Sequence, residues 1–579
     1  MDKSRKEKLI FLFFCFVLVF SVYGRTLAGD FVFDDRSIAD NYHLLQFNNL
    51  AHVAATPYWT EAAGLYRPVT LISYALNFSF FGQGPWSFHL INLILYALSG
   101  YLFFLLLQRV FARKEISYLV SILFLLLPIH SEVVANITGR SELLALFFSL
   151  LVFLELIKKK PGPWRAGFYF LLAIGSKETA IAVLPLAAII VYFKLKFKRR
   201  GSAEPAESFL FREKMVFAKE QEIGKKGSLK LMVGRIKFSF DNWFISIFLE
   251  KYFYPAIGLL IGGSIYFFVR YLVLGRKYFL AVATSVVENP IKFVSVKERI
   301  ITAFGVLTMY LKKSFWPVKL CSDYSYNQIP VLHNFNFEAL VGLSVFLFFI
   351  FAIFFFWKRQ PILAFGLAWF IFSFLPTANL FFSTGTIAGE RLMYYPSVGL
   401  CIFLALALLF LKRLPPAKIF YALFWIVLAG LAAFYCIAGF RRGGDWLTEK
   451  ALFSSAAKCA PNSVLSLSNL GAEYYLEGNL PEAKKELLAA QGIYDGYPKG
   501  INNLGLVYWK EGDNEKAREY FLKALNFEFP FYGAYENLGL LSLQEEKYDE
   551  AKKWLIEFYS GNENAADLYI QNYLKASGQ

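Results

Sequence analysis

Apolar runs separated by short basic segments fill residues 1–440, whereas residues 461–579 are charged and contain no run long enough to cross a bilayer. A transmembrane helix needs about 20 consecutive apolar residues. The pattern therefore predicts an all-α polytopic membrane part followed by a separate helical part. Eleven spans are predicted, of which the first is the run LIFLFFCFVLVFSVYG at 9–24. The others lie near 89–108, 116–134 and 141–157, as two short spans between 161 and 195, and near 252–274, 337–356, 361–376, 394–412 and 417–439.

Basic segments between the spans set the predicted orientation, because cytoplasmic loops carry an excess of Lys and Arg. RVFARKE, KKKPGPWR and KLKFKRR are therefore placed in the cytoplasm with the N-terminus. The last two segments are so close together that two short spans must meet at an outer turn, Ser176-Lys177-Glu178. The first run is similar to a signal peptide, but no clean small-residue cleavage site follows it, which favours an uncleaved anchor. In both cases residue 30 emerges outside, and we expect the membrane to be the cell inner membrane.

Residues 299–316 are apolar but interrupted by Lys312 and Lys313, and we expect an outer, interfacial or re-entrant helix there. If this segment does not span, the basic segments WKRQ and LKRLPPAK fall in the cytoplasm; if it spans, both fall outside. The first alternative is preferred, and it places the C-terminus outside. Residues 195–250 are predicted to be a cytoplasmic insertion, and residues 275–336 an outer loop.

A 34-residue period runs through residues 461–579. The residues that recur in phase are Asn469-Leu470-Gly471, Asn503-Leu504-Gly505, Asn537-Leu538-Gly539, then Ala483, Ala517 and Ala551, and then Tyr474 and Tyr508. This period, with a small residue at the helix crossing, is typical of tetratricopeptide repeats (TPR), which stack as helix pairs into a solenoid. Such a solenoid offers a concave surface to a peptide or protein partner; the alternative is a solubilising or dimerising appendage. A connecting helix is predicted at 441–460.

Composition agrees with a membrane protein, because 57% of the 579 residues are hydrophobic and only 18% are charged, against about 25% charged in soluble domains. The formal charge of +16 fits basic cytoplasmic loops that face anionic lipid, and there is no lysine-rich tail or nucleic-acid module. Of the five cysteines, Cys15, Cys401 and Cys436 lie in apolar runs and only Cys321 and Cys459 lie outside them. They indicate neither a metal site nor a disulfide framework.

Asp34 and Asp35, in the stretch GDFVFDDRSIAD, lie a few residues beyond the first run and are predicted to be outside. An isolated acid pair is more commonly a solvated loop or a helix cap. A functional site is favoured because the predicted topology brings other unusual polar groups to the same side, several of them at span boundaries, where charge is costly unless it lines a wet cavity. These groups are Arg67, His89, His130, Glu132, Arg140, Lys177, Glu178, Arg270, Asp323, Tyr324, Glu390 and Arg391.

Each of these groups also has a plainer interpretation. Arg140 or Lys177 can reach the membrane interface with its charged end. Glu390 and Arg391 can form a surface pair, and His130 can be a core histidine. Taken together, the groups predict a cleft with acids for catalysis and cations for an anionic substrate.

Such a cleft suits a substrate with a phosphate at the headgroup level and a tail in the bilayer, such as a polyprenyl-phosphate sugar. Transfer from this donor needs a base for the acceptor hydroxyl and cations that stabilise the departing phosphate. No P-loop, dinucleotide fingerprint, zinc motif or Ser/His/Asp arrangement indicates a different chemistry, and no cofactor or metal is expected.

Seven stretches in this order resemble the membrane O-mannosyltransferases that carry C-terminal tetratricopeptide repeats, within the wider GT-C glycosyltransferase superfamily. The stretches are FVFDDRSI (31–38), YRPVTLISYALN (66–77), FHLINLILYAL (88–98), LPIHSEVVANITGRSELLA (127–145), SKETAI (176–181), SDYSYNQIP (322–330) and GERLMYYPSVG (389–399). The resemblance implies an eleven-helix GT-C fold over residues 1–440, a lipid-phosphate mannose donor, and transfer with inversion to Ser/Thr hydroxyls on proteins.

The resemblance also implies roles for single residues. Asp34 matches the catalytic base and Asp35 supports it, while Arg140, Lys177 and Arg391 match positions where cations hold the donor phosphate. Two other functions remain open. One is a related GT-C transferase that uses another lipid-linked sugar on lipid or polysaccharide acceptors. The other is a membrane-anchored TPR scaffold without enzymatic activity, which requires neither the many spans nor an outer acid pair.

Overall fold

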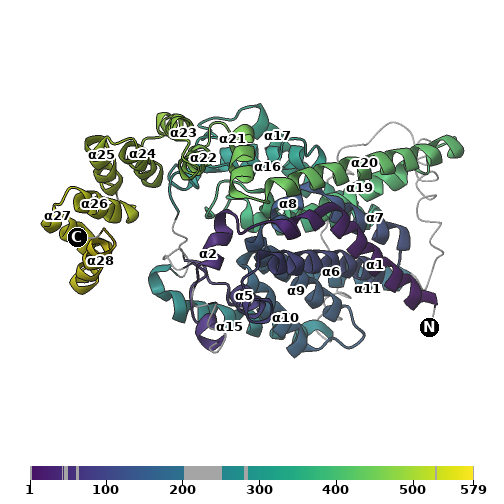
Figure 1. Ribbon diagram of the computed structural model, residues 1–579. Coiled ribbons are helices and arrows are strands. Elements are labelled where there is room, and N and C mark those ends of the chain that lie inside the picture. The colour runs from purple at the N-terminus through teal and green to yellow at the C-terminus, as the bar shows by residue number, and fades with distance from the viewer. Residues whose placement is uncertain are drawn as a thin grey trace.

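The computed structural model describes residues 3–41, 44, 50–59, 64–200, 251–278, 284–527 and 531–577. Every regular element in these ranges is a helix, which confirms the all-α class. Figure 1 shows a bundle of long helices from which a stack of short helices, α22 to α28, extends at one end. The loop with helix α2 (Arg36–Ala39) lies at this same end of the bundle.

Helices occupy all the predicted spans. They are α1 (Lys3–Tyr23), α6 (Pro85–Phe111), α7 (Lys114–Leu126) with α8 (Ser131–Ala135), α9 (Arg140–Leu156), α10 (Pro163–Ser176), α11 (Val183–Arg200), α15 (Phe253–Tyr278), α17 (Phe337–Arg359), α18 (Pro361–Phe374), α19 (Ser397–Leu411) and α20 (Ala417–Asp445). By length and composition, seven helices in the described ranges can cross a bilayer, or eight if the bent pair α7–α8 is one span. Several long apolar helices thus make this a polytopic membrane protein, while the count of eleven spans stays a prediction.

Prolines decide where several of these helices begin. Pro68, Pro85, Pro163 and Pro361 stand at the start of α5 (Pro68–Phe81), α6, α10 and α18. At a first helical position the missing N–H of proline costs no intrahelical bond. Pro128 likewise begins the 3-10 turn Pro128–His130 that leads into α8, and the segment Pro128–Ala135 is bent by 52° from α7. The predicted break between the two short spans falls at Lys177, after the end of α10.

Helices α10 and α15 approach closely because glycines line both sides of their crossing. A Cβ atom on Gly167 would lie 2.3 Å from the carbonyl oxygen of Gly258, and one on Gly258 would lie 2.2 Å from that of Pro163. Gly262 faces Gly167 one turn later. Small residues four apart are a common means of bringing membrane helices into backbone contact.

Helix α16 (Val296–Phe315) is the segment predicted to lie outside without spanning. Ser295 and Glu298 form a capping box at its start, and one face buries Ile301, Leu307 and Tyr310. It is not among the helices of the described ranges that are long and apolar enough to cross a bilayer, and its location outside the membrane stays a prediction.

The repeats form three helix pairs and a final helix. They are α22 (Val464–Leu476) with α23 (Leu480–Ile493), α24 (Pro498–Lys510) with α25 (Asn514–Leu525), α26 (Gly533–Gln544) with α27 (Tyr548–Phe558), and α28 (Glu563–Ser577). Ala483, Ala517 and Ala551 are fully buried, as the periodicity predicts. A Cβ atom on Gly505 would lie 2.5 Å from the ring of Phe521, so the crossing tolerates no larger residue there.

Three expectations need correction or restriction. The interpretation of the cysteines was wrong, because Cys321 and Cys459 form a disulfide across 138 residues; the sequence shows the two thiols but not that the fold brings them together. The predicted connecting helix at 441–460 is the end of α20 followed by a separate helix, α21 (Glu449–Cys459). Residues 195–200 continue α11, and the rest of the predicted insertion lies outside the described residues.

Candidate active site

The acid pair lies in a short 3-10 turn, Phe33–Asp35, directly before α2. The Asp35 carboxylate is buried and accepts hydrogen bonds from the backbone N–H groups of Ile137 (3.1 Å) and Thr138 (2.8 Å). Burial raises the pKa of Asp35 to about 8, against the opposing effect of these amides. Asp35 therefore joins the loop to the turn that begins α9.

Asp34 is different from its neighbour. It is half-buried, and in the described part of the chain its carboxylate has no hydrogen-bond or ion-pair partner. Burial raises the pKa of Asp34 above its usual value, Arg391 opposes this shift, and Glu132 adds to it. An unengaged carboxylate with a raised pKa has the properties required of a general base.

Two cations predicted to hold a phosphate lie in this region, each already paired with an acid. Arg391 donates its backbone N–H (2.9 Å) and Nη1 (2.8 Å) to Glu132. The Arg391 side chain is 31% exposed, against 2% for Glu132. Lys177 forms an ion pair with Glu142, and both are buried. Arg391 and Lys177 act on each other electrostatically, so the two pairs belong to one cluster.

A further set of charges extends the cluster. Arg67 and Arg270 both contact Glu178, each at 3.1 Å, and the Arg67 guanidinium stacks 4.8 Å from the ring of Tyr58. Arg67 also acts electrostatically on Asp34. We name Asp34, Arg67, Glu132, Glu142, Lys177, Glu178, Arg270 and Arg391 the cleft cluster.

Arg140 is placed apart from this cluster. It is fully buried, its Nε donates to Asn92 (3.0 Å), and its Nη2 donates to Asn77 and to the carbonyl of Phe88, both at 2.9 Å. The guanidinium also lies 4.7 Å from the Tyr74 ring. Such a saturated, buried guanidinium holds helices together and has no free face for a phosphate.

The two candidate histidines are also core residues. His130 is fully buried between the Tyr96 hydroxyl (2.9 Å) and the Ser397 hydroxyl (2.7 Å), as its plainer interpretation held. His89 is buried beside Gly29, where a Cβ atom would come within 3.3 Å of its Nε2. The structure thus brings neither ring into the contacts of the cleft cluster.

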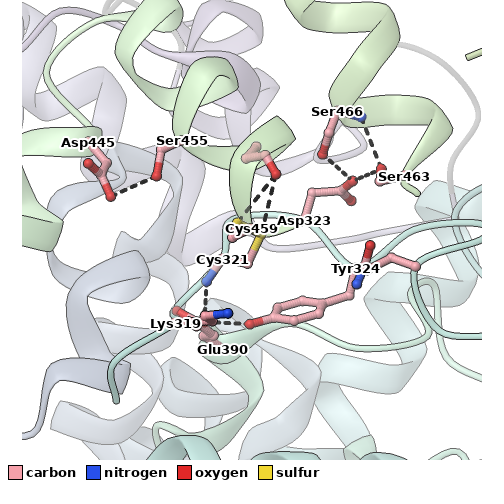
Figure 2. Close-up of a disulfide and its surroundings, with 12 residues drawn as sticks. Lys319, Cys321, Asp323, Tyr324, Glu390, Asp445, Ser455, Cys459, Ser463 and Ser466 are labelled. Atoms are coloured by element: carbon pink, nitrogen blue, oxygen red, sulfur yellow. Dashed lines mark hydrogen bonds between the residues drawn. A yellow bond between two sulfur atoms is a disulfide. The ribbon is translucent and has the colours of Figure 1, made fainter. Parts of the chain in front are cut away.

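The remaining three candidates lie around the start of the repeats, which Asp323 contacts directly (Figure 2). Asp323 accepts hydrogen bonds from the hydroxyls of Ser463 and Ser466 (2.8 Å for Ser466) at the start of α22. Tyr324 donates its hydroxyl to Glu390 at 2.5 Å, and the backbone N–H of Cys321 donates to the same oxygen at 2.6 Å.

Glu390 is fully buried, and burial raises its pKa to about 7, against the effect of Arg442 and Lys313. The Cys321–Cys459 disulfide lies between Glu390 and α21 (Figure 2). We name Cys321, Asp323, Tyr324, Glu390, Arg442, Cys459, Ser463 and Ser466 the junction network.

The sequence interpretation missed residues that the fold makes important. Glu142, the partner of Lys177, lies in the stretch GRSELLA, two residues after Arg140. A carboxylate next to an apolar run is unusual, so the sequence could have indicated Glu142 as a candidate. Glu449 had no such signal, because its contacts with the Asp34 loop join residues more than 400 positions apart. No group of three or more His, Cys, Asp or Glu side chains suited to a metal occurs among the described residues.

The fold and the cleft cluster together define the class: an all-α polytopic membrane protein that carries a charged, half-buried site next to a TPR solenoid. A family model described as Tetratricopeptide repeat matches residues 498–529. The chain is similar to the Protein O-mannosyl-transferase TMTC3 of Homo sapiens, with 28% identity over 502 residues that cover 82% of this chain and 50% of that protein.

Two further similar proteins are also named Protein O-mannosyl-transferase. The Protein O-mannosyl-transferase F38B6.6 of Caenorhabditis elegans is 27% identical over 84% of this chain and 63% of its own length. The Protein O-mannosyl-transferase TMTC4 of Mus musculus is 27% identical over 80% of this chain and 64% of its own length. The chain spans about half the length of the human relative. These similarities confirm the resemblance that the seven stretches indicate.

Proposed function

We propose that this chain is a membrane mannosyltransferase. It moves mannose from a polyprenyl-phosphate donor to Ser/Thr hydroxyls of extracytoplasmic proteins, with inversion and with Asp34 as general base. The observation that carries the proposal is the state of Asp34, an unengaged half-buried carboxylate under the influence of Arg391. The names of the similar proteins support mannose as the sugar and protein as the acceptor.

The chemistry is a single displacement. An oxygen of Asp34 takes the proton of the acceptor hydroxyl while the hydroxyl oxygen forms a bond to C1 of mannose. The bond from C1 to the phosphate oxygen breaks, and polyprenyl phosphate leaves with the electron pair. Arg391 and Lys177 stabilise the negative charge of the departing phosphate. Asp35 contributes by fixing the loop through its two backbone bonds.

A lipid-linked donor is supported by a second feature. A cavity of about 900 Å³ lies along α16, away from Asp34. Its lining is mostly apolar, including Val306, Met309 and Ile329, with Lys312 and Lys313 at one end. Such a groove suits the hydrocarbon chain of a lipid. The charges of the cleft cluster, not the volume of this cavity, decide where we place the reaction.

The proposed location follows from the orientation and from the disulfide. Disulfides persist in oxidising compartments, so the Cys321–Cys459 bond supports an extracytoplasmic face for the junction network, the repeats and Asp34. The N-terminus is then cytoplasmic, and the membrane is the cell inner membrane. On this face the repeats are suited to recruit the protein acceptor, because they begin beside the Asp34 loop (Figure 1).

The test is transfer of labelled mannose by the purified full-length chain in lipid. Polyprenyl-phosphate mannose serves as donor, with a short Ser/Thr peptide and a folded envelope protein as two acceptors. We expect transfer to both, higher for the folded protein, with the product in the inverted configuration. Transfer from a nucleotide sugar alone would contradict the lipid donor, and transfer of a different lipid-linked sugar would restrict the proposal to the wider GT-C class.

A further inference from the structure

The loop that carries Asp34 is held from two sides. Asp35 fastens it to the membrane part. On the opposite side Glu449, the first residue of α21, accepts the backbone N–H of Phe33 on Oε1 at 3.1 Å, and its Oε2 forms an ion pair with Arg36. The Glu449 side chain is 10% exposed, whereas that of Arg36 is 55% exposed. The bond to Phe33 is therefore the better shielded of the two.

Apolar contacts follow the same path. Val32 and Phe33 share one cluster with Leu452 and Phe453 of α21, and the rings of Phe33 and Phe453 meet edge to face at 5.8 Å. The backbone N–H of Asp30 donates to the carbonyl of Leu447, just before α21, at 3.0 Å. The segment before Asp34 is thus packed and hydrogen-bonded onto the helix that leads into the repeats.

Phe33 has an unusual backbone, with φ of +58°. Residues with a Cβ atom seldom adopt this left-handed conformation, and they keep it only where their surroundings hold them there. Phe33 directly precedes Asp34, so its φ and ψ determine where the Asp34 carboxylate points. The Glu449 carboxylate, the edge-to-face ring contact and the turn of Asp35 are the contacts that hold it.

We infer that Glu449 is a positioning residue for Asp34: it fixes the left-handed conformation of Phe33 and thereby aims the general base. This inference rests on the proposed function, in which Asp34 is the base. Helix α21, which is not one of the predicted membrane spans, would then help to position the general base. Leu470 and Tyr474 of the first repeat pack in the same cluster as Phe33, so the repeats and the base share one support.

The test compares three single variants in the full-length chain. Glu449→Ala removes the contacts with Phe33 and Arg36, together with the contact of Glu449 with Glu473. Glu449→Gln keeps an oxygen that can accept from Phe33 but loses the ion pair, and Arg36→Ala removes the ion pair while leaving the Glu449 carboxylate in place. We expect kcat to fall about tenfold for Glu449→Ala, the effect of one lost charge-assisted hydrogen bond, with the donor KM unchanged. The other two variants should keep kcat near the wild-type value. Lys450→Ala is the matched control, since Lys450 on the same helix pairs with Glu477 at 2.7 Å and lies over the ring of Tyr474 at 5.8 Å, so its loss perturbs the same support without removing a bond to Phe33.

A double variant separates positioning from a general loss of stability. In an Asp34→Asn background, Glu449→Ala should cause no further loss, because there is no base left to aim. An equal loss in both backgrounds would overturn the inference, as would wild-type kcat in Glu449→Ala.

Hydrogen exchange supplies a readout that does not depend on activity. Glu449→Ala should speed amide exchange in residues 29–39, and Lys450→Ala should not. If Asp34→Asn kept full activity, the proposed function would fail, yet exchange would still decide whether Glu449 holds the loop. Unchanged exchange in Glu449→Ala would overturn the inference alone.

Discussion

The cleft cluster and the junction network contain similar residues, yet their carboxylates have different surroundings. In the junction network Oδ2 of Asp323 accepts from the hydroxyls of Ser325, Ser463 and Ser466, and Oδ1 accepts from the backbone N–H of Ser325. Oε1 of Glu390 accepts from both Tyr324 and Cys321, while its buried Oε2 has no partner among the described residues. In the cleft cluster Asp34 has no partner within the described residues.

The comparison shows that the exposure of a charged side chain and its hydrogen-bond partners, more than its residue type, distinguish a candidate active-site residue from a structural one. Buried polar groups in proteins are almost always paired, and an unpaired one requires an explanation. Asp323 is explained by the docking of α22, whose Ser463 and Ser466 donate to it. For Asp34, which is half-buried and has no partner among the described residues, the explanation that we propose is the proton it accepts during the reaction.

The largest expected effect comes from matched substitutions in the two regions. Asp34→Asn keeps the size of the side chain but removes the proton acceptor, so kcat should fall by about 10² to 10⁴-fold, with donor KM and melting temperature little changed. Asp323→Asn should leave kcat close to wild type and instead weaken the docking of the repeats, because hydrogen bonds to a charged group contribute about 1.5–3 kcal/mol. Steady-state kinetics and limited proteolysis between α21 and α22 measure the two effects. Full activity of Asp34→Asn would remove it as the base.

A smaller effect is expected for the cations. Arg391→Ala should raise the donor KM by about one to two decades, since a charge-assisted contact to phosphate contributes about 1.5–3 kcal/mol. Arg442→Ala, the matched change in the junction network, should lower thermal stability and leave the donor KM unchanged, because Arg442 pairs with Asp445 at 2.7 Å. Binding of polyprenyl phosphate, followed by calorimetry, provides the measurement. Equal effects of the two variants on donor affinity would erase the distinction between the regions.

The smallest effect is a displacement of the pH profile. A general base acts when deprotonated, so activity should fall as the pH drops through the pKa of Asp34. Because burial raises that pKa, the acidic limb of kcat/KM should lie above the value of about 3.9 for a free aspartate. Asp35 and Glu390 also have raised pKa values, of about 8 and about 7, so the profile is compared in Asp35→Asn and in Glu390→Gln. The limb should persist in both variants; its disappearance in either one would assign the ionisation to the residue changed there.

Much of the fold could be predicted from sequence because the signals are local. Apolar runs mark helices that must satisfy their backbone internally in a bilayer, and the 34-residue period marks repeats that contact only their neighbours in sequence. Lys312 and Lys313 predict that α16 does not span, and α16 is not among the candidate spans of the described ranges. The helix break at Lys177 and the burial of Ala483, Ala517 and Ala551 could also be predicted, because they too depend on local sequence.

The site could be predicted only in outline. The sequence identified the charged residues of the site but not which of them are accessible to a substrate. An arginine beside an apolar run looks the same in the sequence whether it lines a cavity or lies in the core. Only the tertiary structure separates Arg140, whose donors are saturated by asparagines and a carbonyl, from Arg391, which remains partly exposed.

The sequence by itself thus determined the helices, the repeats and the acid pair, all of which depend on neighbours in the chain. The tertiary structure alone decided which acid is free, which cysteines are joined, and that Glu449 supports Phe33 from 416 residues away. The physical reason is that hydrogen bonding and desolvation act through space. Their partners are fixed only once the helices pack.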